Sequence, residues 1–500
     1  MPIRHGLISA VRLMLRKGKA HMMPRKDRAS RLALFALLLG QCMTAMDVAM
    51  VNVSLPSIRE DLNINIAAAG WVMIIFFLLT TSFMISLGRL GDISGHKKVF
   101  ATGLLFFMGG SLASGLSPGY YLLLGGRALQ GIGAGMISSN LPALMTAVFP
   151  EEERGKALGL AAATISLGLA AGPFLGGLIS GTVGWRYLFF IAPLLLPASI
   201  ILCYRFVPEN RAAEAEAMDI YGAGLILFFF APATLAMTQG RIWGWTSPAT
   251  TGLLIISMAA AWLFVRHERT AAHPVIELRL FSNPDFTLSN LAYFACFICL
   301  QTVLFATPFF LQYFLEMTPQ AIGVVIGTIN ILAFLLLVPS GILSDRMGTM
   351  RLETAGMAFI CLSLALLAFA GSSLTLLLVL VSLILLGMGY GVFCSPNYSA
   401  VLGSVMESRR GVAGGVYSTM RNIGSLTGTA MASSVLGQWA VDAASLREAG
   451  GSYTSPAFTA AVRHAYLAAL LVACVGLLLL VVKYLRDRKK PGPLAKRQTV

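Results

Sequence analysis

Two ionisable side chains, Asp47 and Arg127, lie inside long apolar runs of the sequence. A charged side chain at the centre of a bilayer costs about 2.5 to 3.5 kcal/mol on insertion scales, so such residues are functional hypotheses by default. Burial disfavours the ionised form of a carboxyl group, whereas a nearby guanidinium group favours it. The two residues therefore predict a site that binds and releases a proton, with a purely structural ion pair as the alternative.

The depths of these two side chains are compatible with direct contact. Asp47 lies fifteen residues beyond Leu32, about 22 Å from one boundary of its apolar run at 1.5 Å per residue. Arg127 lies seven residues beyond Tyr120, about 10 Å from the opposite boundary. Across a hydrocarbon core of about 30 Å these depths nearly coincide, so the pair can interact if the two helices face each other. Gln130 follows Arg127 by one helical turn.

Composition indicates that lipid is the main solvent of this chain. Hydrophobic residues make up 57% of the 500 residues and charged residues only 12%, whereas soluble domains carry about a quarter charged residues. Fourteen apolar runs are each long enough to cross about 30 Å of hydrocarbon as a helix. They cover residues 32–53, 69–88, 99–117, 120–149, 157–182, 186–207, 219–239, 249–266, 286–314, 319–340, 353–372, 374–402, 412–438 and 463–483. We therefore predict an all-α polytopic membrane protein with fourteen transmembrane helices.

Basic residues are distributed unequally between the two sides of these spans. If the N-terminus is cytoplasmic, thirty of the thirty-seven Lys and Arg residues fall on the cytoplasmic side, and Arg127 and Arg421 lie within spans. The five on the outer side are Arg59, Arg186, Arg241, Arg447 and Arg463. The positive-inside rule predicts such a bias, so we expect both termini on the cytoplasmic side of the inner membrane. We expect the net charge of +15 to face anionic lipid headgroups, with no nucleic acid as a partner.

Other sources of chemistry are missing from the sequence. It contains no phosphate-binding GxxxxGK[ST] loop, no GxSxG elbow and no HExxH motif, so we expect neither an enzyme nor ATP-driven transport. The seven cysteines fall inside apolar runs, which favours packing over disulfides, and we expect no metal site and no cofactor. An ion gradient remains as the energy source, because one charge moved through the membrane potential provides about 2.3 kcal/mol per 100 mV.

A loop sequence occurs twice and divides the chain into two related halves. GRLGDISGHKKVF at 88–100 follows the second span, and GILSDRMGTMR at 341–351 follows the tenth. Repeated loops imply repeated helix bundles. The expected segments are a basic N-terminal stretch (1–31), an N-terminal six-helix bundle (32–207), a linker with inserted helices seven and eight (208–285), a C-terminal six-helix bundle (286–485) and a basic tail (486–500).

These loops resemble the cytoplasmic loop motif of the major facilitator superfamily, G-x-L-a-D-r-x-G-r-k. The matching positions are Gly88, Asp92, Gly95, Lys97 and Lys98 in the first loop and Asp345 and Arg346 in the second. The fourteen-span layout looks like the drug/proton antiporter family of the multidrug efflux type, over residues 32 to 485. The resemblance implies the major facilitator fold, with two six-helix bundles and two inserted helices.

The same loop motif implies a latch between the halves at the cytoplasmic face. In this role Asp92 contacts the positive N-terminal end of the span that begins after Arg409 and Arg410. The alternative is that Asp92 is a solvated acid in the loop. Ile93 and His96 stand where the family commonly has arginine, so we expect a thinner charge network around Asp92 than in relatives.

A second motif lies in the fifth span. GLAAGPFLGG is similar to the exporter motif of the superfamily, g-x-x-x-G-P-x-x-G-G, at Gly168, Gly172, Pro173, Gly176 and Gly177. Glycines spaced by four let helix backbones approach closely, and a proline removes one helical hydrogen bond and permits a bend. Ordinary small-residue packing is the alternative, but the resemblance implies export rather than import.

The resemblance extends to the two charges within the spans. MDVAMVNVSLPSI at 46–58 looks like the membrane-embedded acidic motif of the family, and RALQGIGAGM at 127–136 resembles its R-x-x-Q-G segment. It implies that Asp47 carries the coupling proton and that Arg127 sets its affinity. Because Asp47 is the only acid that the sequence places deep in a span, we expect small substrates that are neutral or monocationic.

Polar and aromatic side chains within spans are candidates for a substrate cavity, namely Gln130, Gln301, Gln312, Asn330, Tyr390, Asn397, Tyr398 and Arg421. The leading function is proton-coupled export of drugs or toxic metabolites. The alternatives are a dedicated exporter of one endogenous metabolite, siderophore or lipid, and a non-transporting membrane sensor. Expected partners are a small-molecule substrate, protons, membrane lipids and accessory export proteins, and the oligomeric state is not written in the sequence.

Overall fold

The computed structural model describes residues 28–149, 153–209, 219–271, 277–369, 375–447 and 456–489. Its α-helices are α2 (Arg28–Asp61), α3 (Ile66–Ser94), α4 (His96–Gly115), α5 (Tyr120–Val148), α6 (Arg154–Thr182), α7 (Ile191–Phe206), α8 (Ile220–Trp243), α9 (Pro248–Thr270), α10 (Pro284–Tyr313), α11 (Pro319–Met347), α12 (Thr349–Phe369), α13 (Leu376–Gly403), α14 (Arg410–Arg447) and α15 (Pro456–Lys489). Each of these fourteen helices of the described residues overlaps one predicted span, which confirms the all-α fold. Most of the predicted N-terminal stretch and basic tail lies outside the described residues.

Side-chain caps at helix starts explain why the connections are short. The Asn65 side chain accepts a hydrogen bond from the Ala68 N–H at 2.7 Å at the start of α3, and Asp219 accepts one from the Gly222 N–H at 2.7 Å at the start of α8. Ser247 caps α9 in the same way, and a proline follows at its first position. Such caps satisfy amide groups that have no partner within the helix. Neighbouring helices can therefore follow one another after only a few residues.

Twelve helices of the described residues are long and apolar enough to cross a membrane. The two that fall short, α5 and α14, have sufficient length but carry more glycine and polar residues, including Arg127 and Arg421. Glycine and polar side chains lower mean hydropathy, yet they suit helices that pack against other helices rather than against lipid. The two weaker spans are therefore interior helices of the bundle.

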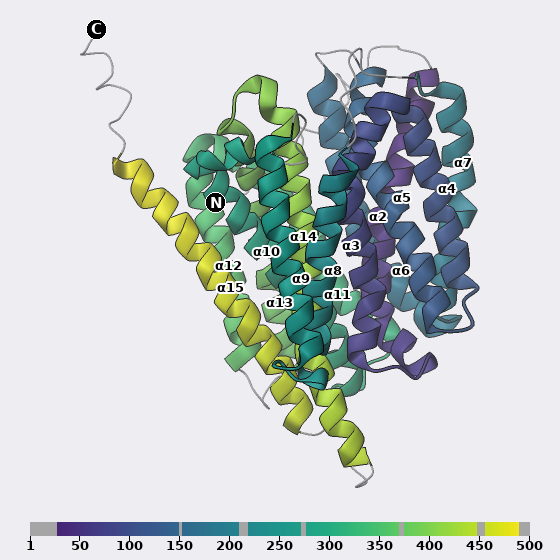
Figure 1. Cartoon of the computed structure of the whole chain (residues 1–500), viewed down its shortest axis with the longest axis vertical. Coiled ribbons are helices and arrows are strands. Elements are labelled where there is room, and N and C mark those ends of the chain that lie inside the picture. The colour runs from purple at the N-terminus through teal and green to yellow at the C-terminus, as the bar shows by residue number, and fades with distance from the viewer. Residues whose placement is uncertain are drawn as a thin grey trace, which may run out of the picture.

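The helices form two bundles that lie side by side (Figure 1). Helices α2 to α7 pack together on the right of the view, and α10 to α15 form the second group, with α12, α13 and α15 on the left. Helix α8 packs against α3 of the first bundle and α14 of the second, and α9 packs mainly on α8. The structure therefore has the expected two six-helix bundles and an inserted helix pair.

Helix α6 joins the bundles through glycines. A Cβ atom at Gly177 would lie 2.4 Å from the carbonyl oxygen of Pro319 in α11, and one at Gly323 would lie 2.4 Å from the carbonyl oxygen of Pro173. On its other side α6 meets α2, where a Cβ at Gly176 would lie 2.8 Å from an α2 backbone atom. No larger residue fits at these distances without movement of the backbone, so the contact between α6 and α11 depends on glycine.

Hydrogen bonds between the bundles gather toward the end of the molecule that bears Asp61, which we call the Asp61 end. Arg59 donates to the Tyr313 hydroxyl at 3.1 Å, and Gln312 donates to the Glu60 carboxylate at 3.0 Å. The opposite end carries the loops at 88–100 and 341–351, and we call it the loop end. The two bundles are therefore held together at the Asp61 end.

We call the contacts between the two bundles the seam. The glycine contact between α6 and α11 within this seam predicts that Gly177→Val destabilises the protein. A valine side chain at this position meets the α11 backbone and forces α6 and α11 apart, whereas Gly159→Val on the same helix is a matched control because nothing lies within 4 Å of its Cβ position. Overpacking of this kind costs about 1–3 kcal/mol. Thermal unfolding of the purified variants in detergent should show a lower Tm for Gly177→Val alone. Equal Tm values for the two variants would contradict the role of the seam.

Candidate functional site

Asp47 of α2 and Arg127 of α5 form a buried ion pair. The Arg127 Nη1 lies 2.5 Å from the Asp47 Oδ2, and the same nitrogen donates to the Gln130 Oε1 at 2.9 Å. The Gln130 amide nitrogen in turn donates to the Asp47 Oδ1 at 3.0 Å. Arg127 and Gln130 are fully buried, and Asp47 is 4% exposed. The structure thus brings Asp47 and Arg127 into the contact that their depths predicted, and Gln130, one helical turn after Arg127, joins them.

Neighbouring helices satisfy the remaining donors of this network. The Arg127 Nε donates to the Val72 carbonyl oxygen of α3 at 3.0 Å, and the guanidinium carbon lies 4.6 Å from the centre of the Phe76 ring. Gln130 also donates to the Ser111 hydroxyl of α4 at 2.7 Å. Gln130 was a cavity candidate, but its amide is engaged by Asp47 and Ser111 rather than left for a substrate.

This arrangement links a proton to helix position. When Asp47 binds a proton, Arg127 loses its counter-charge and keeps only neutral acceptors around it. An uncompensated buried charge is strongly unfavourable, so the guanidinium group gains by moving toward water or another acceptor. The network can therefore couple protonation of Asp47 to a shift of α2 relative to α5.

The first loop motif lies at the loop end, where Asp92 pairs with His96. The two side chains are 3.1 Å apart, and the other ring nitrogen of His96 is 2.8 Å from the Asn140 side-chain oxygen. Gly95 has a φ of +102°, which favours glycine, at the junction of α3 and α4. Asp92 makes no hydrogen bond or ion pair to α14 in the described part of the chain, so the latch to α14 stays a prediction. In this chain His96 is therefore the partner of the loop aspartate.

The other latch residues are spread over the loop end. The Lys97 ammonium donates to the Tyr204 carbonyl oxygen of α7 at 2.7 Å, and Lys98 is exposed. A Cβ at Gly88 would make only an ordinary contact, 3.4 Å from Ser139. Asp345 and Arg346 are both exposed at the end of α11. The repeated loop thus presents its charges to solvent in this conformation.

The exporter motif packs along α2. A Cβ at Gly168 would lie 2.7 Å from the Cys42 carbonyl oxygen, and one at Gly172 would lie 2.5 Å from the Ala49 Cβ. Together with Gly176 and Gly177, these glycines place α6 directly between α2 and α11. The motif therefore connects the helix that carries Asp47 to the opposite bundle.

The predicted cavity residues do not form one cluster. Gln301 donates to Asn52 of α2 at 3.3 Å and Gln312 donates to Glu60, so both lie at the seam between bundles. Asn330 is buried in α11 at 7% exposure. Asn397 is fully buried and donates to the Ser289 carbonyl oxygen at 3.2 Å. These residues have separate structural contacts, because helix rotation decides which neighbour each one meets.

A group of aromatic residues does gather around the remaining candidates. The rings of Tyr293 (α10) and Tyr417 (α14) are stacked with centroids 3.6 Å apart and an interplanar angle of 17°. The candidate Tyr398 lies 5.0 Å from the Tyr417 ring, and the candidate Tyr390 lies 5.5 Å from the Phe297 ring. The sequence analysis missed Tyr293 and Tyr417. The sequence signal for each was only a tyrosine within a predicted span, and packing alone brings the two together.

The sequence analysis also missed a second buried ion pair, between Glu353 of α12 and Lys483 of α15. The Lys483 Nζ lies 3.2 Å from the Glu353 carboxylate and donates to the Ser289 hydroxyl at 2.7 Å, and Asn397 contacts the same carboxylate at 3.4 Å. Glu353 is fully buried and Lys483 is 5% exposed. A second acid besides Asp47 is therefore buried, about one turn from the start of α12, and Lys483, which the sequence analysis counted with the cytoplasmic charge, is buried as well. The predicted span 463–483 ended at Lys483, whereas α15 continues to Lys489.

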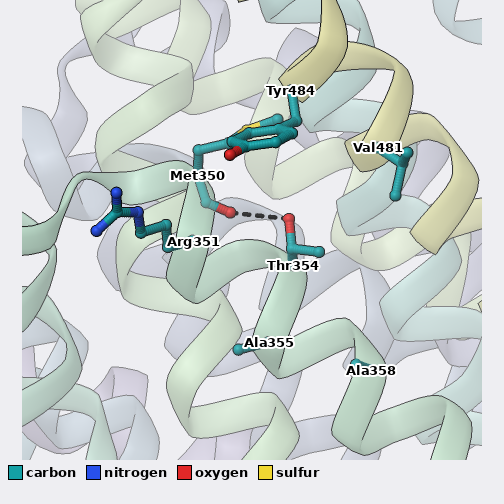
Figure 2. Close-up of a pocket in the computed structure, with 7 residues that line it drawn as sticks. All are labelled: Met350, Arg351, Thr354, Ala355, Ala358, Val481 and Tyr484. Carbon is teal, nitrogen blue, oxygen red and sulfur yellow. Dashed lines mark hydrogen bonds between the residues drawn. The ribbon is translucent and has the colours of Figure 1, made fainter. Parts of the chain in front are cut away.

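A pocket of about 360 Å³ lies between α12 and α15, and Figure 2 shows its lining residues Met350, Arg351, Thr354, Ala355, Ala358, Val481 and Tyr484. The Thr354 hydroxyl donates to the Met350 carbonyl oxygen at 2.9 Å, so it is satisfied within its own helix. Neither helix contributes to the Asp47 network. The pocket is therefore separate from the proton-binding candidate.

Comparison with known proteins identifies the family of this chain. Residues 37–429 match the model of the Major Facilitator Superfamily. The riboflavin transporter RibZ of Clostridioides difficile is 30% identical over 90% of this chain and 96% of its own length. The multidrug resistance protein Stp of Mycobacterium tuberculosis is 32% identical over 83% and 77%, and the tetracenomycin C resistance and export protein of Streptomyces glaucescens is 26% identical over 80% and 74%.

Solved structures agree on the fold. A D-xylose–proton symporter superposes with a TM-score of 0.63 at 15% identity, over 90% of this chain and 96% of its own. A bacterial homologue of the lysosomal transporter Spinster, in an inward-facing and unoccupied conformation, gives a TM-score of 0.62 at 15% identity over 93% and 100%. The chain therefore belongs to the major facilitator superfamily, a family of membrane transporters and not of enzymes.

Proposed function

We propose that this transporter is a proton-coupled antiporter that exports small hydrophobic molecules, neutral or carrying one charge, across the cytoplasmic membrane. The observation that carries the proposal is the buried ion pair of Asp47 and Arg127. It is a titratable acid within a span, held by a partner that protonation would release. An ionisable residue of this kind is the component that proton coupling requires.

Helix α2 supplies the connection from the proton to the substrate path. Beyond Asp47, the same helix meets α6 at Met50, α10 at Asn52 and the end of α10 at Arg59. A shift of α2 on protonation therefore acts on contacts that hold the two bundles together. Rocking of one bundle against the other about this seam gives alternating access.

The orientation follows from the distribution of basic residues. We place the loop end in the cytoplasm because the positive-inside rule favours it, which makes the Asp61 end the outer face. In this orientation the hydrogen bonds of Arg59 to Tyr313 and of Gln312 to Glu60 join the two bundles at the outer face. The Asp92 latch to α14 then belongs to the opposite state, in which the cytoplasmic side closes.

Export as the direction is supported by the exporter motif and by relatives named for drug resistance, Stp and the tetracenomycin C exporter. A second candidate is a dedicated transporter of one metabolite. It is favoured by the likeness to the riboflavin transporter RibZ, which extends over 96% of that protein. Both candidates use the same coupling site, because pocket residues rather than the fold set the substrate.

The first test replaces Asp47 with asparagine, which keeps the shape of the side chain but removes the proton-binding group. Purified protein is reconstituted into vesicles with an imposed pH gradient, and the movement of three naphthyl probes is followed: 2-naphthalenesulfonate, 2-naphthalenesulfonamide and trimethyl(2-naphthylmethyl)ammonium. Wild-type protein should drive at least one probe against its gradient, and Asp47→Asn should reduce that movement to the level of protein-free vesicles. Asp61→Asn is the matched control, because Asp61 is a half-exposed ion-paired acid at the end of the same helix. Wild-type rates from Asp47→Asn at matched expression would remove Asp47 from the mechanism.

Arg127 is tested in the same vesicles. Arg127→Ala should impair gradient-driven movement severely, because Asp47 then remains buried without its cation. Arg127→Lys should recover only part of it, since a point charge replaces a planar fork that contacts Asp47, Gln130 and Val72 together. The loss of one charge-assisted hydrogen bond corresponds to roughly a tenfold or larger change. Full activity of Arg127→Lys would show that charge alone is sufficient.

The orientation is tested by labelling single cysteines in a cysteine-free background with a maleimide that does not cross membranes. Thr246→Cys, exposed between α8 and α9, should react in intact cells. Glu407→Cys, exposed before α14, should react only after the membrane is permeabilised. The reverse pattern would invert the proposed topology, and labelling of both positions in intact cells would rule out the fourteen-span assignment.

A further inference from the structure

Arg421 lies about a third of the way along α14, and the described part of the chain gives it no counter-charge. It is the twelfth residue of a helix that begins at Arg410, about 16 Å from the helix start and close to the midpoint of a core of about 30 Å. The side chain is half-buried, and among the residues that the structure describes no hydrogen bond or ion pair engages its guanidinium group. Arginine keeps its charge in proteins, so an anion or water must meet it there.

Aromatic side chains from three helices gather near this cation. Tyr417 lies one turn before Arg421 and stacks on Tyr293, and Phe297 contacts the edge of Tyr390. Arg421 lies close enough to interact electrostatically with both Tyr293 and Tyr390. Tyr390 is half-buried, whereas Tyr293, Phe297 and Tyr417 are buried. The result is a fixed positive charge beside an aromatic wall built from α10, α13 and α14.

An unsatisfied donor of α2, the Asn52 amide, lies next to Gln301 of α10. Gln301 follows Phe297 by one helical turn and donates to the Asn52 oxygen of the opposite bundle at 3.3 Å. The Asn52 amide nitrogen has no hydrogen-bond partner although the residue is 2% exposed. Buried amide donors are almost always satisfied, so this one is suited to an acceptor supplied by a ligand.

The deep acids, by contrast, are already neutralised. Asp47 is paired with Arg127, and Glu353 is paired with Lys483. Neither carboxylate is left to balance a cationic substrate, whereas the guanidinium group of Arg421 is left to balance an anionic one. These charges therefore favour an anionic substrate, whereas the sequence analysis expected a neutral or monocationic one because it placed Asp47 as the only deep acid.

We propose that this region binds a planar aromatic molecule with a single negative charge, a carboxylate or sulfonate, as the substrate class of the transporter. The proposal rests on the proposed export function. The anionic group pairs with Arg421, whose planar fork matches two oxygens of such a group. The ring packs on Tyr390, and an acceptor at the far end of the molecule meets the Asn52 amide. Substrates of this class are amphipathic, and only their anionic end requires a cation in the binding site.

The test measures equilibrium binding to purified full-length protein in a neutral detergent, with no pH gradient. The probes are 2-naphthalenesulfonate, the isosteric neutral 2-naphthalenesulfonamide and trimethyl(2-naphthylmethyl)ammonium, followed by the fluorescence anisotropy of the naphthyl group. Wild-type protein should bind the sulfonate at least about tenfold more tightly than the sulfonamide, as expected for a charge-assisted pair. Arg421→Gln should abolish this preference, and Arg421→Lys should keep part of it.

Two further variants separate charge from stacking. Arg410→Gln removes the same charge from the exposed start of the same helix, where Arg410 pairs with Glu407, and should keep the wild-type preference. Tyr390→Leu should weaken sulfonate and sulfonamide binding alike, since it removes the ring contact and leaves Arg421 in place. If Arg421→Gln does not fold, the preference for the sulfonate over the sulfonamide in wild-type protein and in Arg421→Lys still tests the proposal.

Three outcomes would overturn the proposal: wild-type protein that binds the sulfonamide or the ammonium probe as tightly as the sulfonate, wild-type protein that binds none of the probes, and an undiminished sulfonate preference in Arg421→Gln. Because this measurement uses no proton gradient, a failure of coupling at Asp47 leaves its result unchanged. Conversely, loss of the sulfonate preference does not affect whether vesicles show gradient-driven movement. The two proposals can therefore fail independently.

Discussion

The buried charge pair of Asp47 and Arg127 imposes the strictest constraint on this molecule. Asp47 and Arg127 are stable inside the bundle because α3 and α4 contribute hydrogen-bond partners to the network, in addition to Gln130 of α5. The Ser111 hydroxyl reaches the network because α4 and α5 approach closely, at a point where a Cβ on Gly110 would lie 2.5 Å from the Gly126 carbonyl oxygen. Small residues thus allow the close approach that the polar network needs, and the network fixes where the helices converge.

The two bundles each bury an ion pair, but the pairs occupy different positions. Glu353 and Lys483 connect α12 and α15 within the second bundle, with Ser289 of α10 and Asn397 of α13 completing the contacts. This pair ties four helices into one unit and touches no helix of the first bundle. The Asp47 pair, by contrast, uses α2, which also forms the seam. A charge pair inside one unit favours rigidity, whereas a charge pair on a seam helix can change the relation between units.

Prediction from sequence succeeded where the physics is local to one segment. Apolar runs of about twenty residues gave the helices, and depth along two of them predicted the contact between Asp47 and Arg127. It missed the contact between Glu353 and Lys483, because each of them stands at the very end of a predicted span, where a charged side chain is expected to face water. Long side chains next to an apolar run can be buried when a neighbouring helix supplies the opposite charge, and that neighbour is not visible in the local sequence.

The sequence by itself determined the class of protein, the number of helices and the glycine motif on α6, because lipid demands long apolar helices and close packing demands small residues. Only the tertiary structure decided which polar side chains meet. It engaged the amide nitrogens of Asn397 and Gln130 within the protein, and among the residues that it describes it left the Arg421 guanidinium group without a hydrogen bond or ion pair. The physical reason is helix rotation: the direction in which a side chain points is set by how neighbouring helices pack, and apolar surfaces on every side of a membrane helix leave that rotation undefined in the sequence.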